Sequence, residues 1–178
     1  MKIILARHTE TNYNLLKLCN SDPIVDVHLS DDGILQANNL AELLKNADFE
    51  IIYISELPRT EETASYINKY HNVKMLVDER INDNKTGYEN KSVFEWQRAL
   101  ASSDNKWEAK FNNGESLTEA ANRASEFIDD LRTKNYGSAL VVTHGFITQA
   151  IFAKIENKTL EEANEFNLPQ GTYTEFEI

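Results

Sequence analysis

The feature that most constrains the fold is a set of short, unbroken apolar runs, each of which ends in polar residues. These runs occupy residues 3–6, 51–54 and 139–142, and they are rich in β-branched side chains. A short apolar run of this kind is typical of a strand that is buried on both faces of a parallel sheet. The chain is therefore expected to build a sheet that helices cover on both sides.

Helical patterns separate the runs. Ser30 stands as an N-cap before a segment whose leucines are expected to share one face, namely Leu35, Leu40, Leu43 and Leu44. Pro58 suits the first turn of a helix that reaches about residue 69. A capping-box pattern at Ser116 and Glu119 opens a helix through about residue 131, and Thr159 with Glu162 repeats that signal.

Two weaker strand patterns complete the alternation of strands and helices. They lie at residues 75–77 and 173–178, and the second alternates like a closing edge strand. This order predicts an α/β fold, a three-layer α/β/α sandwich with a largely parallel central sheet. We expect residues 1–178 to form a single domain, with a lid-like excursion at about residues 78–111.

Charge and cysteine content narrow the class of partner. Eighteen Lys and Arg against 29 Asp and Glu give a net charge of −11, which disfavours nucleic acid and anionic membranes as partners. The apolar runs fall short of the roughly 20 residues that span a bilayer, and Arg7 ends the first one too early for a secretory signal. The lone Cys19 fits a reducing compartment. We therefore expect a cytoplasmic protein, and the acidic charge leaves a small phosphorylated metabolite open as a partner, because screening lets local arginines dominate a pocket.

Arginine, histidine or serine residues follow three of the expected strands. Arg7 and His8 end the first run, Ser55 and Arg59 follow the second, and His144 follows the third. Ligands of open α/β sheets bind at the carboxyl ends of the strands. If these strands are neighbours, two arginines and two histidines converge on one pocket, and such a composition is typical of a phosphate site.

Each of these residues, taken alone, also has a structural explanation. Arg7 could be a surface cation, and His144 could be a hydrogen-bonded structural histidine. Arg59 could pair with Glu56 or Glu62 on its own helix. Their joint placement at strand ends favours the phosphate site over these separate explanations.

The ordered motifs of the chain resemble those of the histidine phosphatase superfamily, in its phosphoglycerate mutase-like branch. Arg7-His8-Thr9-Glu10-Thr11 with Asn14 is similar to the family's opening Arg-His-Gly-Glu-Thr and following Asn. Further similar stretches begin at Asp26, Ser55 and Asn113, and Val141-Val142-Thr143-His144-Gly145 is similar to the family's Val-Val-Ser-His-Gly. The resemblance extends over nearly the whole chain, which makes it far more specific than Arg-His alone.

The resemblance implies a metal-independent phosphatase that needs no cofactor and hydrolyses small-molecule phosphomonoesters. His8 would be the nucleophile and would carry a phosphohistidine intermediate. Arg7, Arg59 and His144 would bind the phosphate oxygens, where charge lies in the transition state, and Asn14 would add a neutral donor. The two guanidinium groups would keep His8 neutral, whereas His144 could become cationic once substrate is bound.

A general acid must protonate the leaving oxygen and later activate water. The family places a glutamate at the position that Asp83 occupies in the stretch 78–83. Aspartate is a shorter arm and a stronger acid in free solution. Glu79 or Glu89 could serve instead if the loop folds differently.

Departures from the family pattern concern the surroundings of the expected site. Thr9 stands where the family has glycine, and it would be strained if that position needs a positive φ. Pro23 and His28 replace an expected glycine and proline, and residues 86–90 shorten a family motif. Since none of these changes touches the four core residues, we expect phosphoryl chemistry with a diverged substrate.

Two other functions remain open from the sequence. One is phosphoglycerate mutase-type phosphotransfer, although the mutases resembled here are longer, with insertions that close over the site. The other is a non-catalytic phospho-ligand binding module, which the changes at Thr9 and Asp83 would support. Tyr88, Trp96 and Trp107 could face the ligand or pack in a core or lid. No nucleotide-binding glycine motif follows any expected strand.

Overall fold

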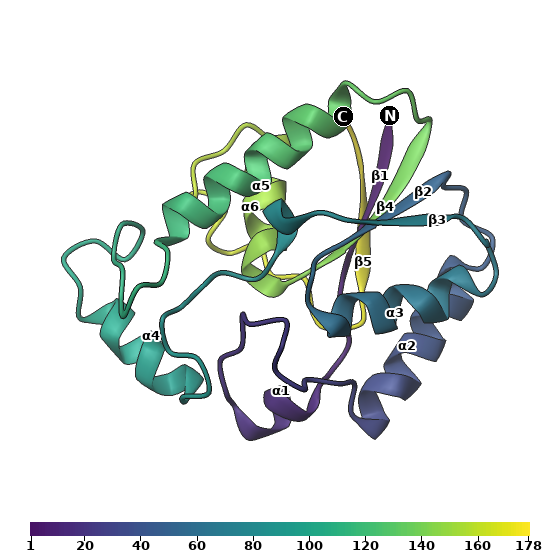
Figure 1. Ribbon diagram of the computed structural model, residues 1–178. Coiled ribbons are helices and arrows are strands. Elements are labelled where there is room, and N and C mark those ends of the chain that lie inside the picture. Colours follow the sequence, from purple (N-terminus) through teal and green to yellow (C-terminus); the bar gives the residue numbers. More distant parts are fainter.

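The computed structural model describes all 178 residues and contains a five-stranded sheet in the order β3-β2-β4-β1-β5. The strands are β1 (Lys2–Arg7), β2 (Ile51–Ile54), β3 (Lys74–Val77), β4 (Ser138–Thr143) and β5 (Tyr173–Glu177). The first four run parallel, and β5 pairs antiparallel with β1 at the sheet edge (Figure 1). All five predicted strands are confirmed, including the closing edge strand.

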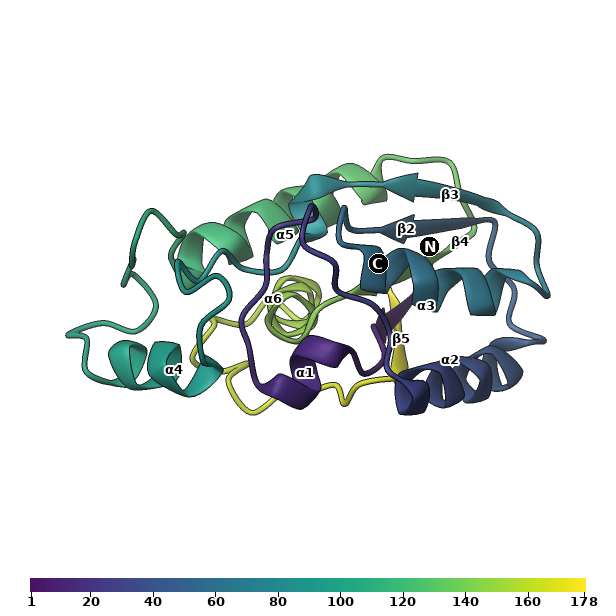
Figure 2. The same ribbon diagram turned by 60° about the horizontal axis from the view of Figure 1, so that its bottom comes forward.

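Helices cover both faces of the sheet, so the predicted three-layer arrangement is confirmed (Figure 2). One face packs against α5 (Leu117–Arg132) and α6 (Gly145–Ile155), and the other against α2 (Asp31–Leu44) and α3 (Pro58–Asn68). Along β1 the side chains alternate between the two cores. Ile3 and Leu5 join the α5–α6 side, whereas Ile4 and Ala6 join the α2–α3 side.

The helix starts follow the predicted caps. The Ser30 hydroxyl accepts a hydrogen bond from the Gly33 N–H at 3.0 Å, and Pro58 occupies the first turn of α3. At the start of α5 the Ser116 N–H donates to Glu119, whose own N–H donates back to the Ser116 hydroxyl. Each cap satisfies backbone donors that the first helical turn leaves free.

Two expectations about helices are wrong. The leucines of α2 do not share a face, because Leu35 and Leu43 are 62% and 68% exposed while Leu40 and Leu44 are buried. Small residues (Ala37 and Ala41) complete the buried stripe instead.

The second wrong expectation concerns Thr159. Its hydroxyl and N–H exchange hydrogen bonds with Glu162 as a capping box would, yet residues 160–165 form turns and no helix follows.

The excursion after β3 contains a short 3-10 helix, η1 (Glu79–Ile81), and the helix α4 (Val93–Ala101). Isolated bridges between Leu18 and Ser92 and between Cys19 and Glu89 join it to the loop that follows α1 (Asn12–Leu16). The two segments therefore lie side by side at the carboxyl edge of the sheet (Figure 2).

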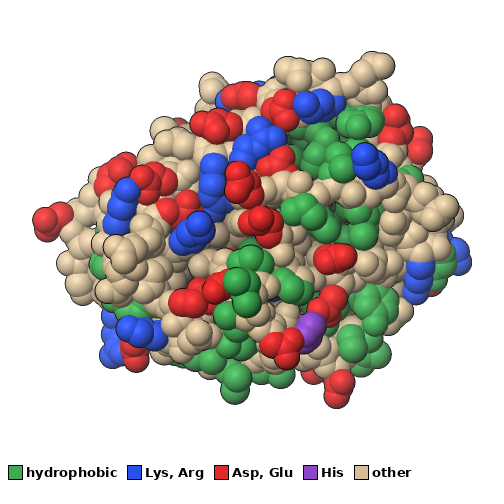
Figure 3. All heavy atoms as spheres, in the orientation of Figure 1, with side chains coloured by type: hydrophobic (Ala, Val, Ile, Leu, Met, Phe, Trp, Pro, Cys, Tyr) green, Lys and Arg blue, Asp and Glu red, His purple; other side chains and the backbone are tan.

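The outer surface reflects the composition of the chain. Acidic side chains are spread over the face seen in Figure 3 and are interspersed with lysines and arginines. None of the helices combines the length and the apolar character that crossing a membrane requires.

Candidate active site

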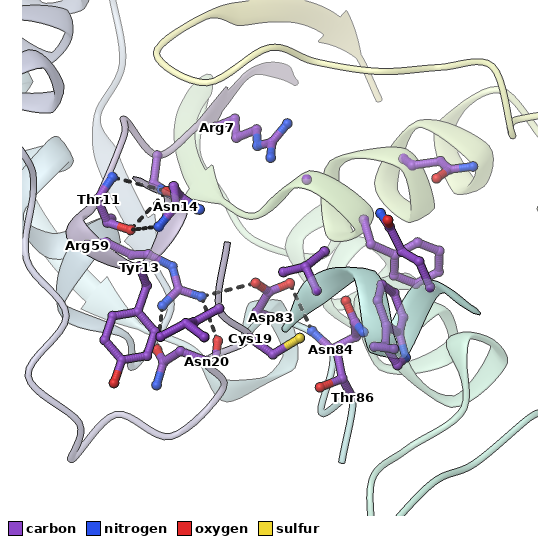
Figure 4. A pocket seen from close by; sticks show the side chains of 18 of the residues that line it. Arg7, Thr11, Tyr13, Asn14, Cys19, Asn20, Arg59, Asp83, Asn84 and Thr86 are labelled. Atoms are coloured by element: carbon purple, nitrogen blue, oxygen red, sulfur yellow. Dashed lines mark hydrogen bonds and ion pairs between the residues drawn. The ribbon is translucent and has the colours of Figure 1, made fainter. Parts of the chain in front are cut away.

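The carboxyl ends of β1, β2 and β4 bring the predicted residues together. Arg7 pairs in register with Thr143, and the rings of His8 and His144 lie 5.2 Å apart between centroids. A cavity of about 470 Å³ opens at this edge, within the size range of small-molecule sites. Among the residues that line it are five of the six predicted site residues: Arg7, His8, Asn14, Arg59 and Asp83 (Figure 4).

His8 is held as a neutral imidazole with a defined tautomer. Its Nδ1 lies 2.7 Å from the carbonyl oxygen of Thr9, which can only accept, so the proton sits on Nδ1 and Nε2 keeps its lone pair. Burial lowers the pKa of His8 well below its ordinary value, and the charges of Arg59 and Arg7 act in the same direction. The ring therefore presents an unprotonated nitrogen beside two cations.

His144 is fully buried behind the cavity wall and is oriented by its neighbours. Arg59 Nε donates to its Nδ1 at 3.3 Å, so its Nε2 carries the proton and donates to the Ser55 hydroxyl at 2.9 Å. Ser55 in turn donates to Thr60 at 3.0 Å, and Thr60 donates to the Leu57 carbonyl. Burial, followed by the charge of Arg59, lowers the pKa of His144 well below its usual value.

Among the cations that line the cavity, Arg59 makes the most hydrogen bonds. Besides His144, it donates through Nη1 to the Asn20 side-chain oxygen at 2.7 Å and through Nη2 to the Asn20 carbonyl at 3.0 Å. Nη2 also pairs with Asp83 Oδ2 at 3.0 Å. The predicted alternative pairing with Glu56 or Glu62 is not formed, because Glu56 binds Asn82 and Glu62 binds the loop before α2.

Arg7 is bound much more loosely than Arg59. Nη1 donates to the Leu168 carbonyl at 3.0 Å, but the buried Nε has no partner. A Cβ at position 145 would lie 2.9 Å from the Arg7 guanidinium carbon, so glycine allows this approach to the start of α6. Burial lowers the pKa of Arg7, and the carboxylate of Asp83 opposes that shift. An anion that enters the cavity would therefore find the Arg7 guanidinium group with N–H donors that have no protein partner.

Asn14 is positioned to act as a donor. Its Oδ1 accepts from the Thr11 N–H at 3.0 Å, from the Thr11 hydroxyl at 2.9 Å and from Gln170 at 2.7 Å. These contacts fix the amide group and leave Nδ2 without a protein acceptor. The geometry agrees with the neutral donor that the resemblance implied.

Asp83 is the one carboxylate that lines the cavity. Its Oδ2 lies 3.0 Å from Arg59 Nη2 and 3.7 Å from His144 Nδ1, and its Oδ1 accepts from the Asn84 N–H. The two alternatives lie elsewhere. Glu79 is exposed on η1, and Glu89 accepts hydrogen bonds from Asn20 and Ser21, which fixes the loop that carries Asn20.

A clamp that the sequence did not reveal holds the backbone around Asp83. Arg123, on α5, donates to the carbonyl oxygens of Arg80, Asn82 and Asp83 at 2.8, 2.7 and 3.1 Å. Glu115 holds the same guanidinium through two hydrogen bonds of 2.7 and 3.1 Å. Glu115 lies in the stretch from Asn113 that resembles a family motif, whereas nothing in the pattern of the helix marks Arg123.

Thr9 is unstrained, which corrects the expectation drawn from its position. It is not among the residues with positive φ. Its N–H donates to the Thr63 hydroxyl at 3.2 Å, and its own hydroxyl lies 3.3 Å from the same oxygen. The side chain thus joins β1 to α3 inside the protein.

Of the three aromatic residues considered, only Trp96 lines the cavity. Tyr88 packs edge-on against Phe111, and Trp107 donates to Glu161. No group of three or more His, Cys, Asp or Glu side chains is arranged to hold a metal ion.

Comparison with known proteins agrees with this geometry. The chain is 26% identical to phosphoserine phosphatase 1 of Hydrogenobacter thermophilus over 181 residues, which cover 98% of this chain and 85% of that protein. It is 28% identical to the probable phosphoglycerate mutase GpmB of Yersinia pestis over 154 residues, which cover 82% of this chain and 70% of that protein. Among solved structures, the alpha-ribazole phosphatase from Shigella flexneri superposes with a TM-score of 0.88 at 26% identity, covering 100% of this chain and 91% of that one.

The family assignment rests on nearly the full length of the chain. Residues 3–178 match the histidine phosphatase superfamily (branch 1), from the first strand to the last residue. The match therefore includes each strand end that contributes to the cavity. This chain belongs to the histidine phosphatase superfamily.

Proposed function

We propose that the protein hydrolyses small-molecule phosphomonoesters through a phosphohistidine on Nε2 of His8. The observation that carries this proposal is the 2.7 Å contact between His8 Nδ1 and the Thr9 carbonyl, since it leaves the lone pair of Nε2 free in the cavity. The substrate is a small phosphorylated metabolite. The lone, buried Cys19 supports a reducing, cytoplasmic setting.

In the first step, Arg7, Arg59 and Asn14 bind the phosphate oxygens. The Nε2 lone pair of His8 attacks phosphorus, the P–O bond to the alcohol breaks, and its electron pair stays on the leaving oxygen. That oxygen takes a proton from the Asp83 carboxyl group, and the alcohol departs. The fixed guanidinium groups stabilise the charge that develops on the phosphoryl oxygens.

In the second step, the Asp83 carboxylate takes a proton from water, and the water oxygen attacks phosphorus. The P–N bond breaks, its electron pair returns to His8, and inorganic phosphate is released. His144 positions Arg59 through the 3.3 Å hydrogen bond, and its link to Ser55 fixes the orientation of its ring. The lid role is proposed for residues 78–111, because this excursion carries both Asp83 and Trp96 into the cavity wall.

The test compares the protein with His8→Ala on p-nitrophenyl phosphate in the presence of a chelator. We expect chelator-resistant release of inorganic phosphate, reduced about 10⁴-fold or more in His8→Ala because the nucleophile is lost. A rapid acid-free quench should recover phosphate bound to a histidine in the unmodified protein alone.

Three outcomes would contradict the proposal. Phosphate binding without turnover of any ester would identify a binding module. Transfer between phosphoglycerate isomers without net phosphate release would identify a mutase. Full activity in His8→Ala would move the nucleophile to another residue.

A further inference from the structure

The cavity has two chemically different halves. The only Lys, Arg, Asp or Glu side chains that line it are Arg7, Arg59 and Asp83, and all three lie at the phosphate end. Burial raises the pKa of the Cys19 thiol, so that side chain is uncharged at neutral pH. Beyond the phosphate end the wall is rich in side-chain amides, namely Asn84, Gln97, Gln149, Asn164 and Asn167.

Asn84 provides the clearest sign of a missing ligand group. Its side chain lines the cavity, the residue is only 7% exposed, and its Nδ2 has no hydrogen-bond partner (Figure 4). A buried donor without a partner destabilises the protein, because it has lost its hydrogen bond to water and gained none. An oxygen acceptor on the bound substrate would remove that cost.

Other amides offer both donors and acceptors to the same space. Gln149 donates through Nε2 to the Ala163 carbonyl at 3.0 Å, which leaves its Oε1 as a free acceptor. Asn164 accepts from Lys106 at 3.1 Å through Oδ1, which leaves its Nδ2 as a free donor. Hydroxyl groups both donate and accept, so they can satisfy such a mixed wall.

The distal wall contains no cationic side chain that could pair with a carboxylate on the substrate. No lysine or arginine lines the distal half, and Lys106 behind Asn164 is engaged by that residue and lies 3.9 Å from Glu161. Placing a carboxylate in a partly buried site without a cation is costly. The aromatic residues Trp96 on α4 and Phe146 on α6 also line the cavity, and aromatic rings suit the apolar face of a sugar or base.

We propose that the alcohol released by this enzyme is uncharged and rich in hydroxyl groups, so that the substrates are sugar or nucleoside phosphates and not phosphorylated carboxylic acids. This inference rests on the proposed phosphatase function and specifies the substrate class of the same cavity.

The first test measures kcat/KM on two groups of esters, with p-nitrophenyl phosphate as the reference. One group contains ribose phosphate, glucose phosphate and nucleoside monophosphates, and the other contains phosphoserine and phosphoglycerate. We expect the first group to exceed the second by about tenfold or more, because the unpaired amides are satisfied only by the first. Within the first group, comparing the sugar phosphates with the nucleoside monophosphates shows which of the two classes the enzyme prefers.

A second test changes the charge of the distal wall. Gln97 lines the cavity and makes no side-chain hydrogen bond, so Gln97→Lys adds a cation without removing a contact. We expect the preference for ribose phosphate over phosphoglycerate to fall roughly three- to fivefold, as a partly exposed ion pair allows. Arg98→Gln, on the same helix but outside the cavity, is the matched control and should leave the preference as it is.

A third test removes the unpaired donor. Asn84→Ala keeps the backbone N–H that binds Asp83, and it should lower kcat/KM for sugar phosphates about tenfold more than for p-nitrophenyl phosphate. An equal loss on both esters would indicate a merely structural role and would contradict the assignment of Asn84.

The outcomes separate the two proposals. Absence of turnover on every ester, including p-nitrophenyl phosphate, would overturn the phosphatase function itself. Turnover of p-nitrophenyl phosphate together with equal or better activity on phosphoserine or phosphoglycerate would overturn the substrate class alone.

Discussion

The phosphate end and the distal end of the cavity are carried by different kinds of backbone. Arg7 and His8 stand at the end of the buried strand β1, and Arg59 stands in the first turn of α3. Gln97 and Asn164, by contrast, come from the excursion that contains α4 and from the segment between α6 and β5. The end to which we assign the chemistry is fixed by the core, whereas the end to which we assign substrate selection lies largely on segments outside it, with Gln149 on α6 as an exception.

This difference separates catalysis from selection in physical terms. Strand ends are held by the packing of both cores, so the side chains that bind phosphate keep their positions to the precision that phosphoryl transfer needs. Surface segments tolerate substitution with little cost to the fold. Changes at the phosphate end should therefore affect every substrate alike, and changes at the distal end should affect substrates differently.

The largest expected effect is that of Arg59→Met. Loss of the guanidinium removes transition-state stabilisation and leaves Asn20 and Asp83 without their partner, so kcat/KM should fall about 10³-fold on all esters. Steady-state kinetics on one sugar phosphate and one aryl phosphate would check this. A loss confined to one of these two esters would contradict the view that the phosphate end acts on all substrates alike.

Asp83→Asn should have the next largest effect, and it should depend on the leaving group. Alkyl phosphates need a proton on the leaving oxygen and should slow about 10²-fold, whereas p-nitrophenyl phosphate, with its stable anion, should slow much less. Parallel measurements of kcat on both esters provide the test. Equal slowing, or none, would assign the proton transfer to another group.

Arg123→Met should sharpen the comparison, because it acts on Asp83 from a distance. The three carbonyl contacts are lost, the backbone around Asp83 is freed, and kcat for alkyl phosphates should fall roughly tenfold with little change in KM. Combining it with Asp83→Asn should give less than the product of the two separate losses. Fully multiplicative effects would show that the clamp does not act through Asp83.

The smallest effect concerns the stability of the fold as a function of pH. Since the folded pKa values of His8 and His144 are lowered, the unfolded chain binds more protons, and their contribution is present above about pH 6.5 and lost as the pH falls below it. The free energy of unfolding should decline by up to about 1.4 kcal/mol per pH unit for each histidine. Urea denaturation at a series of pH values between about pH 5 and pH 8 would measure the slope.

His28 provides the control of opposite sign for this measurement. Its hydrogen bonds to Glu62 and Asp26 raise its pKa, so its contribution is present at low pH and lost as the pH rises through that value. Removing it in His28→Gln should make the acid decline steeper. An unchanged decline would show that the exposed contacts do not persist in solution.

The sequence predicted the phosphate end because its residues sit where buried strands stop. The apolar runs located β1, β2 and β4, and a parallel sheet brings Arg7, His8 and His144 to one edge whatever the loops do. Arg59 was placed by Pro58, which marked the start of its helix.

The contact between Arg59 and Asn20, and those between Arg123 and the carbonyl groups around Asp83, could not be predicted in this way. They join residues that are 39 to 43 positions apart along the chain, and they depend on how irregular segments fold over the sheet. The error at Leu35 and Leu43 has a related cause. Leucine content alone does not identify the buried stripe, which in α2 includes alanines that pack closely. The expected strain at Thr9 assumed a backbone conformation that the chain does not adopt there.

The guanidinium group of Arg7, which lines the cavity and makes a single hydrogen bond within the protein, has a consequence for the end of the proposed catalytic cycle. Inorganic phosphate offers this group the same oxygens as the substrate does, so the product should compete for the residues that bind the reacting ester. Affinity that comes from the phosphate alone cannot distinguish the two. Only the contacts of the distal amides can favour substrate over product, and product inhibition should therefore be strongest against esters that do not reach them.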